Sequence, residues 1–135
     1  MLEFTDKFDS FVCVGDSISV DHDGFTVTAR IGYDDCHNID DDDCHNVDQS
    51  VTGCSDEQNE TLIANRKAWF DDEWFYGVIV LSVSKNGVML DENAASLCGI
   101  EVNYPTRDSG YLMEVANELL SEALERGHTV IESLL

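Results

Sequence analysis

The segment EWFYGVIVLSVS, residues 73–84, is apolar at most successive positions and sets the first limit on the fold. A strand with two apolar faces has to lie in the middle of a sheet or be buried on both sides. The Asn86-Gly87 pair that follows is typical of a tight hairpin turn, and VML (88–90) supplies a return strand. The sequence therefore predicts an antiparallel sheet with this segment at its centre.

A second hairpin is predicted nearer the N-terminus. In FTVTARI, residues 25–31, apolar and polar side chains alternate with the two-residue period of a half-buried strand. The turn sequence DHDG (21–24) connects this strand to a preceding one at about 16–20, and LCGIEVNY (97–104) is predicted as a further strand. These segments indicate about five antiparallel strands in all.

A short helix is predicted from residue 55 to about residue 70. Ser55 followed by Gln58 fits a capping box at its start. The apolar residues expected on one side of this helix are Leu62, Ile63, Trp69 and Phe70.

The C-terminal helix, from about residue 111 to residue 126, is amphipathic. The residues that keep helical spacing are Leu112, Met113, Ala116, Leu119, Leu120, Ala123 and Leu124. Asp108 or Ser109 can cap its start, and Gly127 sits where a helix commonly ends. The expected fold is α+β, with two helices on a sheet that can curl toward a small barrel, in a single domain covering residues 1–135.

The sequence favours a soluble, cytoplasmic protein. The N-terminus, MLEFTDKFDS, carries acids where a signal peptide would have basic residues. The longest apolar run, residues 74–83, is about half of the ~20 residues needed to span a bilayer. The 5 cysteines are an odd number in such a chain and are expected to be reduced thiols.

The charge balance limits the partners. The chain has 28 acids against 7 bases and a formal net charge of −21. Such a chain repels phosphate backbones and anionic lipids, so direct binding of nucleic acid or membrane is disfavoured. Cations and proteins with basic surfaces are the natural partners.

An acidic loop is predicted at about residues 34–55, because periodicity is lost there. The loop contains a repeated unit, DDCHNIDD followed by DDCHNVDQ. Its aspartates, expected to form a partner-binding patch, are Asp34, Asp35, Asp40, Asp41, Asp42, Asp43 and Asp48.

A zinc site is the alternative interpretation of the same loop. The candidate ligands are Cys36, His37, Cys44, His45 and Cys54. They provide enough thiol and imidazole groups for four-coordinate zinc, but their spacing differs from the familiar finger patterns. A calcium loop is disfavoured, because the glycine and the closing glutamate that an EF-hand requires are missing after the aspartates.

A second acidic patch is predicted on the C-terminal helix. Glu114, Glu118, Glu122 and Glu125 fall within an arc of about 80°, opposite the apolar stripe, at a spacing of about 5–6 Å along the axis. Like charges at this spacing are destabilising, and the expected offsetting pair is Glu122 with Arg126. Few exposed helical faces lack lysine so completely.

Catalysis is not indicated by the remaining reactive residues. Cys13 and Cys98 lie in strand-like apolar surroundings and are expected in the core, while His22 and His128 are isolated. The chain shows no phosphate-binding glycine loop and no carboxylate pair in an apolar setting. A non-enzymatic protein without a cofactor is therefore expected.

Three stretches resemble a known group of proteins: FVCVGDSISVDHDGFTVTARI (11–31), DEWFYGVIVLSVSKNGVMLDENAASLCGIEVNYP (72–105) and YLMEVANELLSEALERG (111–127). They are similar to uncharacterised small acidic accessory proteins of plasmids, integrative elements and prophages of Gram-negative bacteria. The resemblance implies a mobile-element context, in which acidic proteins often blunt host defences. It implies no catalytic residues and no metal site.

The sequence thus predicts a binding protein whose partner is a basic, nucleic-acid-binding protein, with the two acidic patches imitating DNA phosphates. Two other hypotheses stay open at this point. One is a zinc-binding module built on the Cys-His repeat. The other is a generic acidic protein, for example one adapted to a salt-rich cytoplasm.

Overall fold

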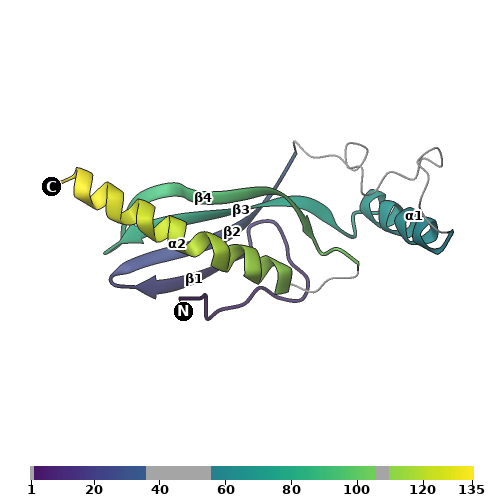
Figure 1. Cartoon of the computed structure of the whole chain (residues 1–135), viewed down its shortest axis with the longest axis horizontal. Helices are drawn as coiled ribbons and strands as arrows, with labels where there is room; N and C mark the ends of the chain where they lie inside the picture. Colours follow the sequence, from purple (N-terminus) through teal and green to yellow (C-terminus); the bar gives the residue numbers. More distant parts are fainter. Residues whose placement is uncertain (1, 36–55, 106–109) are drawn as a thin grey trace.

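The computed structural model describes residues 2–35, 56–105 and 110–135. In chain order the elements are β1 (Ser17–His22), β2 (Phe25–Tyr33), α1 (Asp56–Phe70), β3 (Phe75–Lys85), β4 (Val88–Val102) and α2 (Gly110–Ser133). The strands form one four-stranded antiparallel sheet in the order β1-β2-β3-β4, and α2 lies across one of its faces (Figure 1). This confirms the α+β class and the two helices.

Both predicted hairpins are present. The turns have positive φ angles at both central residues, 51° and 84° at Asp23 and Gly24 and 52° and 80° at Asn86 and Gly87. Such angles match the type I′ turns that suit the twist of adjacent strands. The second hairpin places β3 between β2 and β4, so the segment with two apolar faces is central, as its composition predicted.

The four strands of the sheet agree roughly with the prediction of about five. VML and LCGIEV do not form two strands, because both belong to β4, which pairs with β3 along its length. The register between β3 and β4 shifts at three places, and Gly99 has a positive φ of 70° near one of them. Such bulges bend a strand without ending it. The sheet is also open rather than curled into a barrel, with β1 and β4 at its edges.

The main core lies between α2 and the sheet. Phe25, Val27, Ala29 and Ile31 of β2 are all at most 1% exposed and face the helix, as their alternation predicted. The N-terminal segment adds side chains that the sequence pattern did not indicate: Phe4, Phe8 and Val12 are buried in the same core. The segment is held beside α2 by a hydrogen bond from the backbone N–H of Phe4 to Asn117 Oδ1, at 2.8 Å.

Helix α1 belongs to a separate apolar cluster. Ala68 packs there with Trp74 and Tyr76, and Trp69 and Tyr104 lie at its edge. The apolar side expected for this helix is not buried as a unit, since Ile63 and Phe70 are 54% and 57% exposed. The reason is that α1 packs through Asn65 and Ala68 instead. Ser55, and the side chains of Gln58 and Leu62, lie outside the described part of the chain.

Helix α2 is longer than predicted and runs through Gly127 to Ser133. Its buried residues are Leu112, Val115, Ala116, Leu120, Ala123, Leu124 and Gly127. A Cβ atom at Gly127 would lie 2.9 Å from Val83 Cγ2 and 3.0 Å from the ring of Phe25. The glycine therefore allows close approach of helix and sheet, and its expected role as a helix end was wrong.

Candidate partner-binding surface

The exposed face of α2 carries a line of glutamates. Glu114, Glu118, Glu122 and Glu125, the residues selected from the sequence, are all exposed on this helix. Because the helix continues past Gly127, Glu132 joins them: it follows Glu114 by about five full turns and points in nearly the same direction. Glu132 is exposed as well. We call these five residues the glutamate row.

Sequence reasoning missed Glu132 for a definite reason. It ended the helix at Gly127, and a residue beyond the end of a helix has no defined direction relative to it. The available signal was the apolar spacing itself, because Leu120, Ala123, Leu124 and Gly127 continue the i, i+3, i+4, i+7 pattern of the buried face.

In the described part of the chain, no basic side chain pairs with a carboxylate of the glutamate row. Arg126 was expected to pair with Glu122, but its Nε donates to Asp91 Oδ2 of β4 at 2.8 Å. This bond holds the pKa of Asp91 below its ordinary value, with a further contribution from the backbone N–H of Asn93. Among the described residues no ion pair includes a glutamate of the row, and the last turn of α2 holds no base.

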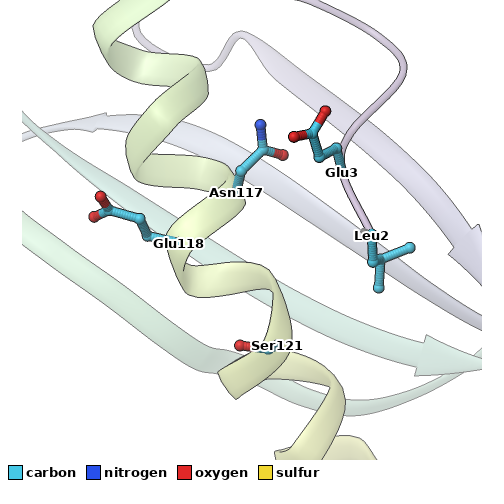
Figure 2. A pocket seen from close by; sticks show the side chains of 5 residues that line it. All are labelled: Leu2, Glu3, Asn117, Glu118 and Ser121. Carbon is cyan, nitrogen blue, oxygen red and sulfur yellow. The ribbon is translucent and has the colours of Figure 1, made fainter.

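A shallow pocket of about 370 Å³ lies between α2 and the N-terminal segment. Leu2, Glu3, Asn117, Glu118 and Ser121 line it (Figure 2). In Figure 2 the side chains of Glu3 and Glu118 extend to opposite sides of Asn117, so the two carboxylates do not converge on one point. The pocket does not have the geometry of a small-molecule site, but it places a further acid, Glu3, beside the glutamate row.

The aspartate patch predicted for residues 34–48 is described only at its first two positions. Asp35 is exposed, as expected. Asp34 is not part of an exposed patch, because it is only 7% exposed. Its backbone N–H donates to the carbonyl of Tyr76 at 3.0 Å, and its Oδ2 accepts from the backbone N–H of Gly99 at 2.7 Å. Asp34 thus connects the end of β2 to the bulge of β4. Asp40, Asp41, Asp42, Asp43 and Asp48 lie outside the described residues.

Replacing Asp34 by alanine is expected to lower the free energy of unfolding by about 1–3 kcal/mol, because the partly buried N–H of Gly99 loses its acceptor. Urea unfolding followed by tryptophan fluorescence measures the change. Asp35→Ala is the matched control and should change stability by about 0.5 kcal/mol or less, as exposed substitutions generally do. Equal losses in the two variants would contradict a structural role for Asp34.

The candidate zinc ligands Cys36, His37, Cys44, His45 and Cys54 also lie outside the described residues. Within the described residues no group of three or more His, Cys, Asp or Glu side chains is arranged to hold a metal ion. Cys13 and Cys98 were expected in the core but are exposed free thiols. Cys98 lies beside Gly99, where the register of β4 shifts, and Cys13 lies in the turn before β1, so neither takes a regular inward-facing strand position.

The two isolated histidines have local structural contacts. His22 Nε2 lies 3.3 Å from Asp23 Oδ2 in the first hairpin turn. His128 packs edge to face against Phe25, with ring centroids 4.7 Å apart. Neither contact brings the imidazole to a second catalytic group.

Comparison with known proteins finds no matching family model, curated protein or solved structure. In the described parts of the chain, no helix is both long enough and apolar enough to cross a membrane. The surface itself therefore has to support any assignment of function.

Proposed function

We propose that this chain binds the basic, nucleic-acid-binding surface of another protein, and that the glutamate row is the contact. The observation that carries the proposal is the row itself: five exposed carboxylates on one face of a single helix, without a neutralising base among the described residues. A solvated helix face normally mixes both signs of charge, because like charges at i and i+4 cost roughly 0.2–0.5 kcal/mol per pair.

The row is comparable in length to a short DNA site. From Glu114 to Glu132 the helix rises about 27 Å, so the carboxylates are spaced about 7 Å apart on average. One DNA strand carries a phosphate about every 3.4 Å along its axis. The row therefore presents about half the linear charge density of one strand over about eight base pairs, which suits a groove that follows one strand.

The row is held on a rigid support, which favours recognition over a diffuse charge effect. The opposite face of α2 is buried against β2, β3 and β4. The Cα positions below the carboxylates are thus fixed before a partner arrives, so less conformational entropy is lost on binding than for a flexible acidic segment.

The position of the row also leaves free energy to be recovered on binding. Glu132 lies in the last turn of α2, where the helix dipole favours positive charge. A lysine- or arginine-lined groove would relieve both this unfavourable placement and the repulsion within the row. Complementary charge of this kind mainly increases the association rate and the specificity.

The test uses the full chain with five Glu→Gln substitutions in the row. Binding proteins are first captured from bacterial lysate on the wild-type chain, and the captured protein is purified and tested for DNA binding. We expect the wild-type chain to displace DNA from it, and the five-fold Gln variant to bind roughly ten- to a hundredfold more weakly. Binding should weaken as salt rises.

The control variant removes the same number of charges from exposed acids elsewhere: Asp6→Asn, Asp9→Asn, Asp23→Asn, Glu60→Gln and Glu73→Gln. It should keep nearly wild-type affinity. An equal loss of affinity in the two variants would mean that only the net charge matters. That result would support the hypothesis of a generic acidic protein. A captured protein that holds DNA and this chain together would also overturn the proposal.

A further inference from the structure

The face of the sheet that α2 leaves uncovered differs in charge from the rest of the molecule. On β2 and β3 the side chains directed to this face are hydroxyls, valines and one arginine, Arg30, with no acid among them. The acids come at the edges of the sheet, Asp21 on β1 and Glu92 and Glu101 on β4. We call this surface the open face. In a chain of net charge −21, it is a surface that a second copy can approach without strong repulsion.

Two pairs of polar side chains on the open face are already hydrogen-bonded to each other. Ser19 Oγ and Thr28 Oγ1 are 2.8 Å apart, and Thr26 Oγ1 donates to Asp21 Oδ1 at 2.7 Å. Covering such hydroxyls costs less than covering unpaired ones, because their partners remain in place. Next to these pairs, half-buried Val80 of β3 and 51% exposed Met89 of β4 supply apolar area.

Arg30 is the exposed charge at the centre of the open face. Among the described residues it takes part in no ion pair. It lines a depression of about 300 Å³ together with Val80, Ser82, Met89 and Glu92. The depression thus has a guanidinium, a carboxylate and aliphatic side chains on one surface. When two copies of such a surface face each other, the guanidinium of one can meet the carboxylate of the other.

The strand register shows how two open faces can pack against each other. A two-fold axis parallel to the strands, between β2 and β3, would place β2 of one copy over β3 of the other and β1 over β4. Arg30 and Val80 are directly opposite each other in the ladder, so this axis brings Arg30 of each copy over Val80 of the other, next to Glu92. Contacts related in this way form twice, as an isologous interface requires.

We propose that two copies of this chain associate open face to open face about this axis, with Arg30 of each copy beside Glu92 of the other. Sheets packed in this manner lie about 10 Å apart with aligned strands. Edge-to-edge pairing, through β1 or β4, is another way for sheets to associate, and at β4 the register shifts interrupt the ladder and protect the edge.

Salt separates this association from the proposed binding of a basic partner. The overall repulsion between two chains is screened as salt rises from about 0.1 M to about 1 M, where the Debye length falls from ~10 Å to ~3 Å. Self-association through the open face should therefore strengthen with salt, whereas binding through the glutamate row should weaken.

The experiment is sedimentation velocity of the full chain over a wide concentration range at low and high salt. We expect a reversible monomer–dimer equilibrium that tightens at high salt. Arg30→Glu should weaken it by roughly tenfold or more, and the exchange Arg30→Glu with Glu92→Arg should restore it. Lys7→Glu makes the same charge change at an exposed site outside the open face and should leave the equilibrium nearly unaltered.

Met89→Glu gives a second, independent disruption on the same face, because the stated axis places this position over Asp21 of the other copy, and circular dichroism verifies the fold of each variant. A chain that stays monomeric at high salt would overturn the proposal, as would a dimer that Arg30→Glu and Met89→Glu leave intact. The five-fold Gln variant of the glutamate row should still dimerise, and Arg30→Glu should still bind the basic partner. Failure of one proposal is thus distinguishable from failure of the other.

Discussion

Replacing Trp74 by alanine is expected to detach helix α1 while the sheet and α2 remain folded. Trp74 is 1% exposed, and its Nε1–H donates to the backbone carbonyl of Asn65 in α1 at 2.8 Å. Its ring also meets Tyr76 and Tyr104 edge to face, at centroid distances of 5.1 and 4.9 Å. Removing so large a buried aromatic side chain typically costs about 3–5 kcal/mol.

The loss should be local because the cluster around Trp74 is separate from the main core. No residue of α1 is among the described residues that form the core between α2 and the sheet. Hydrogen exchange followed by mass spectrometry should show α1 losing its protection in Trp74→Ala, with the amides of β2 and β3 much less affected.

Trp74→Phe is the matched control, since it keeps an aromatic ring but removes the indole N–H and part of the buried ring volume. We expect α1 to remain protected in this variant, with a stability loss of about 1–3 kcal/mol from the missing hydrogen bond and the smaller ring, below that of the alanine variant. If Trp74→Ala instead unfolded β2, β3 and α1 in one cooperative transition, the two clusters would be a single folding unit.

The sequence was informative where local chemistry decides the structure. The alternation of FTVTARI and the Asn86-Gly87 turn are properties of neighbouring residues, so strand faces and hairpins could be predicted from them. The outward direction of Glu114 to Glu125 followed from the same kind of argument, because it depends only on the helical period.

Prediction failed where contacts between residues far apart in the sequence decide the structure. Phe4, Phe8 and Val12 are buried by an irregular segment that runs beside α2, and such a segment has no period to detect. Asp34 stood at the start of an acidic run and was assigned to it. Its carboxylate is instead fixed by Gly99, a residue far along the chain whose position depends on a bulge in β4.

The prediction that the helix ends at Gly127 is the most instructive failure. Replacing Gly127 should also have a large effect on stability, second to that of replacing Trp74. Gly127→Leu is expected to cost about 3 kcal/mol or more, because the new side chain has to displace Val83 and Phe25, which are 0% and 1% exposed. Gly127→Ala gains about 1 kcal/mol in helix propensity. Its Cβ, however, would lie 2.9 Å from Val83 Cγ2 and 3.0 Å from the ring of Phe25, and overpacking of this kind costs about 1–3 kcal/mol. A net loss is therefore expected for alanine as well.

Two further variants show whether the loss comes from this contact. Ser121→Ala changes an exposed position of the same helix, so it should gain a few tenths of a kcal/mol from propensity alone. Val83→Ala removes the nearest methyl group, so adding Gly127→Ala to it should cost less than in the wild-type chain, a coupling that a double-mutant cycle in urea measures. If Gly127→Ala stabilised the chain as much as Ser121→Ala does, α2 would not approach the sheet closely at Gly127. The last turns of the helix, and with them the direction of Glu132, would then lose their support, and the glutamate row would end at Glu125.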